Sequence, residues 1–353
     1  MSRQVAHAPE SGPSRKAPPE SALLTELDLA LVEALQVDPR APWTRIGTAI
    51  GVDATTAARR WERLTSAGLA WLTAYVTVPT LTVGYLDIAC RPEALTALTE
   101  RLCGWQCVFN LERTTGRYQL FLGVSAHGLA GLDRLIARRV AELGGVTAVR
   151  LAVATRVYRE GSGWLVHTLT PQQRAVLDDT AERARLVVPA RWNDTDFEAL
   201  VHALGADGRR SFAELARDCG MSESAVRRRL ARMLVDHELD FRCDLAHGVA
   251  GWPVIGGYRL DVPGDRLDEV GRVVAALPET RLCAAVAGEH NLVLSTWFRA
   301  PSGCLDFEAT LAARLPGVRI AERSITTKMP KRMGRLLDAN GVARGQVPMT
   351  PAP

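Results

Sequence analysis

The chain has 353 residues, of which 47% are hydrophobic and 23% charged, and its formal net charge is +4. This length predicts two or more domains, and the small positive charge permits an anionic partner without requiring one. The first residues lack the apolar core of a signal peptide, and no stretch approaches about 18 unbroken apolar residues, so we expect a cytoplasmic protein that does not contact a membrane. The seven cysteines include no C-x-x-C pair and the seven histidines form no cluster, so we expect neither a metal site nor a cofactor.

Residues 1–22 are rich in Pro, Ser, Ala and charge, which predicts a disordered arm. Residues 23–72 then show the pattern of a helix-turn-helix: two short amphipathic helices, a glycine at position 51, and a third helix capped by Asp53. In the third helix the residues that face the core are Ala57, Trp61 and Leu64. The candidate DNA-binding residues on its outer face are Thr55, Thr56, Arg59, Arg60 and Arg63.

After Gly68 the hydrophobic period changes from helical to strand-like. Residues 75–158 follow the order βαββαβ, which predicts a four-stranded antiparallel sheet with both helices on one face, the ferredoxin-like fold. A linker over residues 159–192 follows, with a possible helix over residues 170–185 that begins at Thr170 and Pro171.

The same order then repeats. We expect a second helix-turn-helix over residues 193–241, a second βαββαβ module over residues 245–328, and a loose tail over residues 329–353 that packs only around Met333–Leu337. Asp38-Pro-Arg40 corresponds to Asp207-Gly-Arg209 at an offset of 169 (207 − 38), and Gly51 corresponds to Gly220 at the same offset. The candidate DNA-binding residues of the second recognition helix are Ser222, Ser224, Arg227, Arg228, Arg229 and Arg232.

The fold class is therefore α+β, a helix-turn-helix plus a ferredoxin-like module, repeated twice in one chain. This architecture resembles the Lrp/AsnC (feast/famine) family of transcriptional regulators, in a tandem two-copy form. Short motifs carry the resemblance: Leu27-Asp28, Asp38-Pro-Arg40 and Gly51 in the first copy, and Asp207-Gly-Arg209 and Gly220-Met-Ser222 in the second. Two hairpin turns, Thr115–Gln119 and Ala287–Asn291, resemble the T-G-x-x-D turn of the family, although an amide replaces the aspartate in both.

The resemblance implies a regulator that binds double-stranded DNA, contacts no membrane and responds to an amino acid or a related metabolite. It also implies that the two sheets pack face to face within one chain, and that such pseudo-dimeric chains form homo-oligomers. The effector is expected near the two turns, whose residues are Gly116, Arg117, Tyr118, Gln119, Gly288, Glu289, His290 and Asn291.

A competing interpretation is an enzyme, because sirohaem decarboxylases of haem synthesis resemble Lrp/AsnC proteins and some are fused as two copies. Those enzymes use His, Arg and Tyr near the hairpin. This chain has Arg113, Arg117 and Tyr118 near the first turn but no histidine there, and only His290 near the second. No nucleophile–base pair is evident. We therefore expect a regulator rather than an enzyme, and both recognition helices keep arginines that a purely structural module would not need.

Overall fold

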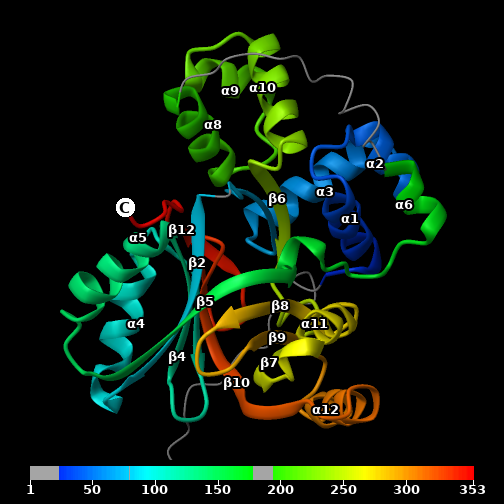
Figure 1. Ribbon diagram of the computed structural model, residues 1–353. Coiled ribbons are helices and arrows are strands. Elements are labelled where there is room, and N and C mark those ends of the chain that lie inside the picture. The colour runs from blue at the N-terminus through cyan, green and yellow to red at the C-terminus, as the bar shows by residue number, and fades with distance from the viewer. Residues whose placement is uncertain (1–23, 79, 178–193) are drawn as a thin grey trace, which may run out of the picture.

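The computed structural model describes residues 24–78, 80–177 and 194–353 (Figure 1). The arm expected over residues 1–22 lies outside the described residues, as does the second half of the helix expected in the linker. The first half of that linker helix is present as α6, Pro171–Leu177. Among these residues no helix is long and apolar enough to cross a membrane.

The first helix-turn-helix comprises α1 (Glu26–Val37), α2 (Trp43–Ile50) and α3 (Ala54–Ser66). Local signals in the sequence define the turn between α2 and α3. Gly51 ends α2 with a φ of 76°, a left-handed conformation that favours glycine. Asp53 then caps α3 by accepting a hydrogen bond from the backbone N–H of Thr56.

The second helix-turn-helix comprises α8 (Asp194–Ala206), α9 (Phe212–Cys219) and α10 (Glu223–Val235). Its turn uses the same chemistry, since Gly220 ends α9 with a φ of 66° and Ser222 caps α10 through the N–H of Ala225. The expected repeat of this unit is therefore present in the structure.

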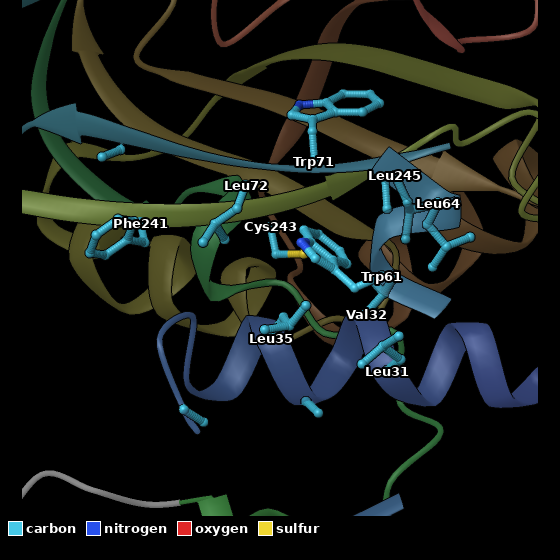
Figure 2. Close-up of a cluster of buried hydrophobic side chains, with 14 of the residues drawn as sticks. Leu31, Val32, Leu35, Trp61, Leu64, Trp71, Leu72, Phe241, Cys243 and Leu245 are labelled. Carbon is cyan, nitrogen blue, oxygen red and sulfur yellow. The ribbon is translucent and has the colours of Figure 1, made fainter. Parts of the chain in front are cut away.

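Two strands that the sequence did not reveal join the helix-turn-helix units. Strand β1 (Ala70–Val76) follows α3, strand β6 (Leu239–Leu245) follows α10, and they pair antiparallel along their whole length. Figure 2 shows side chains from α1, α3, β1 and β6 in one apolar cluster. The two units therefore share a core, and both strands straddle the limits expected between the helical units and the sheet modules.

Both sheet modules have the ferredoxin-like strand order. The first module has the order β3-β4-β2-β5 and the second has β8-β9-β7-β10, which are the same order at equivalent positions. The elements of the first module are β2 (Leu81–Cys90), α4 (Leu95–Cys103), β3 (Val108–Thr114), β4 (Leu120–His127), α5 (Gly128–Arg134) and β5 (Val146–Arg159). Those of the second are β7 (Val254–Asp261), α11 (Leu267–Ala275), β8 (Thr280–Ala287), β9 (Leu292–Phe298), α12 (Gly303–Arg314) and β10 (Arg319–Arg332).

The strands of the two sheets pair with each other at their edges, which corrects the expectation that the sheets only pack face to face. Strand β5 pairs with β8, and β10 pairs with both β3 and β7, so the eight strands of the two modules form a closed antiparallel ring. Closure satisfies the backbone groups that open edge strands would leave unpaired. Helices α4 and α5 cover one side of the ring and α11 and α12 cover the other (Figure 1).

Residues 329–353 are not the loose tail that the sequence suggested. Strand β10 continues to Arg332, and β11 (Arg335–Leu337) and β12 (Ala343–Gln346) extend the sheet. Lys331 is fully buried because its ammonium group donates to the carbonyl oxygens of Cys103 and Trp105, at 2.9 and 2.8 Å. Charged residues in this segment therefore lie in the core with partners, where composition alone indicated solvent.

Candidate DNA-binding helices and ligand cavity

The arginines of recognition helix α3 divide into two groups. Arg60 and Arg63 form ion pairs with Asp28 of α1, at 3.1 and 2.7 Å, and Asp28 is fully buried. Burial raises the pKa of Asp28, but the bonds from Thr25 and Arg63 outweigh that effect and the net pKa is lowered. These two arginines therefore fasten α3 to α1.

The remaining candidates on α3 differ in whether their side chains are already used in contacts within the protein. The hydroxyl of Thr56 donates to the capping carboxylate of Asp53 at 2.7 Å, so it belongs to the cap. Thr55 and Arg59 are exposed to solvent. Thr55 and Arg59 are thus the residues of this helix best placed to reach DNA.

On recognition helix α10 the prediction that Arg229 lies on the outer face is wrong. Arg229 is only 8% exposed, and its guanidinium lies over the ring of Phe197 at 5.6 Å. It follows Val226 by three positions, which places it on the apolar stripe of the helix, and a long aliphatic stem tolerates such burial. Phe197 and Arg229 correspond to Asp28 and Arg60 at the offset of 169 (197 − 28 and 229 − 60). A cation–π contact in the second unit thus replaces an ion pair of the first.

The other candidates on α10 are on the surface. Arg232 pairs with Asp236 at 2.7 Å, and Ser222 is occupied as the cap. The guanidinium of Arg227 lies over the ring of Phe212 at 4.1 Å while the residue remains exposed. The remaining exposed candidates are Ser224 and Arg228.

A reciprocal arginine pair, Arg40 and Arg209, connects the two helix-turn-helix units. Arg40 donates to the carbonyl oxygens of Gly208 and Arg210 at 2.6 and 2.9 Å. Arg209 donates to those of Pro39 and Ala41, both at 2.9 Å. Each arginine therefore bonds the backbone that flanks the other.

Each of these two arginines also stacks on an aromatic ring of the other helix-turn-helix unit. The guanidinium of Arg40 lies 4.8 Å from the ring centre of Phe212, and that of Arg209 lies 3.9 Å from the ring centre of Trp43. Burial lowers the pKa of both arginines to about 10, so both remain charged near neutral pH. The two recognition helices are consequently held in one relative orientation.

A cavity of about 210 Å³ opens at the first hairpin turn, between the two sheet modules. The first module contributes Thr114–Tyr118, and the second contributes Gly257, Arg259 and residues 322–324 of β10. Thr115 attaches the turn to β10, because its N–H donates to the carbonyl oxygen of Ile325 and its hydroxyl oxygen accepts from the N–H of that residue, both at 2.9 Å.

Two charged groups in the cavity are suited to opposite charges on a ligand. Glu112 is 4% exposed, accepts hydrogen bonds from Asn110 and Thr326, and has a pKa raised by burial. Arg117 is exposed, its guanidinium lies 5.6 Å from the ring centre of Tyr118, and no ion pair with a described residue occupies it. The cavity therefore offers a carboxyl group on one wall and an available guanidinium on another.

A four-charge network, Asp87, Arg150, Arg259 and Glu322, borders the cavity. Asp87 pairs with Arg150 and with Arg259, both at 2.8 Å, and Arg150 pairs with Glu322 at 2.6 Å. The bond from Arg150 lowers the pKa of Glu322. The network takes two members from each module, so it joins the halves of the chain from inside the ring.

The predicted effector residues are only partly brought together. Gly116, Arg117 and Tyr118 line the cavity, but Gln119 does not. The side-chain oxygen of Gln119 accepts from the N–H of Cys90, and that of Asn291 accepts from the N–H of Val262, both at 2.9 Å. These two amides hold the turns to the sheet.

The second turn is also occupied by protein contacts and does not belong to this cavity. Glu289 pairs with Arg150 at 3.2 Å, and His290 contacts Asp261 at 2.8 Å. Sequence reasoning missed Glu112 and Arg259 as cavity residues, because strand alternation does not show which strands of different modules meet.

Family comparisons agree with this geometry. The AsnC-type helix-turn-helix domain matches residues 24–65 and 198–234, and the Lrp/AsnC ligand binding domain matches residues 84–164. This chain carries Lrp/AsnC-family domains. The second helix-turn-helix match confirms the tandem repeat of that unit, and the strand order supplies the second sheet module.

The proteins that are similar to this chain include two uncharacterized HTH-type transcriptional regulators. That of Pyrococcus furiosus is 27% identical over 133 residues, which are 37% of this chain and 90% of that protein. That of Pyrococcus abyssi is 27% identical over 134 residues, 38% of this chain and 85% of that protein. Together with the family domains, they support a DNA-binding transcriptional regulator of the helix-turn-helix type with a ligand-binding domain.

The duplicated arrangement also has a counterpart among solved structures. The siroheme decarboxylase NirDL, in complex with an iron-uroporphyrin III analogue, aligns with a TM-score of 0.57 and 16% identity, covering 88% of this chain and 93% of that one. A second crystal structure of the siroheme decarboxylase NirDL aligns with a TM-score of 0.55. At this level of identity the likeness concerns the fold.

Proposed function

We propose that the chain is a sequence-specific regulator that binds double-stranded DNA through both recognition helices and responds to a small zwitterionic metabolite, an amino acid or a relative of one. One observation carries the DNA-binding part. Exposed Arg59 and Arg228 are equivalent at the offset of 169 (228 − 59), and the reciprocal arginine pair fixes the helices that present them. Two rigidly oriented recognition helices suit successive major grooves of one duplex.

The DNA-binding residues we propose are fewer than the sequence suggested. Backbone phosphates would supply most of the affinity and base edges the specificity. The exposed residues on the N-terminal halves of the helices are Thr55 and Arg59 in the first unit and Ser224, Arg227 and Arg228 in the second. Arg60, Arg63 and Arg229 stabilise the domains instead.

Fluorescence anisotropy with the DNA upstream of the protein's own gene tests this proposal. Replacing Arg59 and Arg228 with alanine removes one exposed cation from each helix, and each lost base contact should cost roughly 1–3 kcal/mol. The Arg314→Ala variant, changed at an exposed position at the end of α12, is the control. Wild-type affinity and an unchanged salt dependence in the double variant would remove these helices from the interface.

The cavity supports the effector part of the proposal. Arg117 is suited to a carboxylate and Glu112 to an ammonium group. The volume of about 210 Å³ is below the range of about 300–1,000 Å³ that holds drug-sized ligands. Calorimetric titration with individual L-amino acids should show binding that is weakened in Arg117→Ala and preserved in Arg138→Ala, a change at an exposed position remote from the turn. No binding heat from any of them would refute this effector class.

The likeness to NirDL keeps one alternative function, a decarboxylase that acts on a tetrapyrrole. The small cavity argues against it, because a tetrapyrrole is larger than a drug-sized ligand. The histidine that the sequence offered, His290, is bonded to Asp261 at 2.8 Å. Anaerobic incubation with sirohaem should leave its absorption spectrum and mass unchanged, whereas loss of carbon dioxide would overturn the regulator proposal.

A further inference from the structure

The strand pairings around the cavity match between the two sheet modules at an offset of 172, so the cavity has an equivalent place in the other half of the ring. Tyr85 pairs with Gly123 in the first module, and Gly257 pairs with Ser295 in the second (257 − 85 and 295 − 123). Glu112 pairs with Phe121 as Ala284 pairs with Val293. A symmetric pair of halves would have two ligand cavities.

At two positions the equivalent place has an apolar side chain where the cavity has a polar one. Ala284 stands at the position of Glu112, and Val286 stands at that of Thr114. Both belong to a buried apolar cluster with Tyr85, Phe121 and Val293. Ala284 and Val286 therefore supply neither the carboxyl group of Glu112 nor the hydroxyl group of Thr114.

The equivalent place is also filled. In the cavity, Gly257 has no side chain, and a Cβ atom there would lie 2.7 Å from the hydroxyl oxygen of Ser324. Its counterpart is Tyr85, which is 4% exposed and whose ring packs against that of Phe121 at 5.8 Å between ring centres. A glycine in one half and a large aromatic ring in the other thus decide which place is open.

We infer that, of these two equivalent places in the described ring, the one at the first turn is a ligand site built by both halves, and that Tyr85, Ala284 and Val286 close the other. The class of ligand, a small zwitterion with its carboxylate at Arg117 and its ammonium group at Glu112, rests on the proposed function. One effector therefore binds per chain, and binding shows no cooperativity between the halves.

Thiol labelling tests the single site without any ligand. Thr114→Cys places a thiol in the cavity, and Val286→Cys places one at the equivalent position. Iodoacetamide labelling followed by peptide mass mapping separates these thiols from the native cysteines. The thiol at position 114 should react at least about tenfold faster, because burial disfavours the reactive thiolate and blocks the reagent. Equal rates in two proteins with wild-type circular dichroism would overturn the inference.

A second variant keeps the test decisive if Val286→Cys does not fold. Adding Gly257→Tyr to Thr114→Cys copies the closed half onto the open one, and it should slow labelling at position 114 to the rate of a buried thiol. Labelling that stays as fast as in Thr114→Cys alone would show that a side chain at position 257 does not close the cavity, and would contradict the inference.

Ligand protection separates this inference from the proposed effector. Each common L-amino acid is added in excess before labelling of Thr114→Cys, and those that protect are titrated by calorimetry against the wild-type chain. One binding event per chain is expected, and two would overturn the single site. If none protects, the effector class falls while the difference in labelling between positions 114 and 286 still decides the number of cavities.

Discussion

Mild acid should destabilise this protein through one histidine, His247, which lies between the sheet ring and the helix-turn-helix core. The residue is 8% exposed, its ring centre is 5.5 Å from that of Trp297, and the guanidinium of Arg332 is 3.3 Å from its Nδ1 atom. Burial, followed by the charges of Arg332 and Arg281, lowers its pKa to about 2. The folded protein therefore keeps this imidazole neutral.

The magnitude follows from linkage between protonation and folding. The unfolded chain binds a proton at His247 below about pH 6.5 and the folded chain does not, so the unfolded state holds more protons in acid and stability falls as the pH falls. Between about pH 7.5 and about pH 5.5 this single group should remove about 1.4 kcal/mol from the free energy of unfolding.

Urea unfolding followed by tryptophan fluorescence at both pH values measures this loss. In His247→Gln, which cannot be protonated, the loss of stability between the two pH values should be about 1.4 kcal/mol smaller than in the wild type. His127→Gln, a change at an exposed position, should retain the wild-type difference. A wild-type pH dependence in His247→Gln would refute the assignment, since other titrating groups are common to both proteins and cancel.

Two further predictions concern DNA binding. Arg209→Ala removes the bonds to Pro39 and Ala41, so in anisotropy titrations its affinity for two half-sites at fixed spacing should fall more than its affinity for one half-site. The control Arg210→Ala, changed at the neighbouring position, should bind both DNAs like the wild type. The operator should be asymmetric, because Ala58 and Glu62 of the first recognition helix stand where the second has Arg227 and Ala231. Footprinting with base-by-base substitution tests this, and equal sensitivity at mirror-related positions within one chain's footprint would contradict it.

Local signals predicted the helical units and the strand order well. The caps Asp53 and Ser222 and the turn glycines Gly51 and Gly220 depend only on neighbours in the chain, and each occupies the expected place. The order of strands in each module followed from the alternation of strand and helix, because short connections leave few ways to fold βαββαβ.

Contacts between residues far apart in the chain could not be predicted from the sequence. The partner of β1 is β6, which lies in the other half of the chain, so neither strand had a local signal of pairing. Glu112 gave no sign of lining a cavity, since the opposite wall comes from strand β10. Arg229 was misplaced because a charged residue was assigned to solvent, although its spacing from Val226 put it on the buried face.

The four-charge network favours association of the two different halves over association of two identical ones. Its contacts between modules join Asp87 to Arg259 and Arg150 to Glu322, and these are the same two positions at the offset of 172 with the charges exchanged (259 − 87 and 322 − 150). Two copies of the first half would bring aspartate against aspartate and arginine against arginine inside the ring, and two copies of the second half would repeat the conflict. The charges of each half are therefore complementary to those of the other half and not to those of a second copy of itself. We therefore expect the two halves, expressed as separate polypeptides, to form a heterodimer in preference to homodimers.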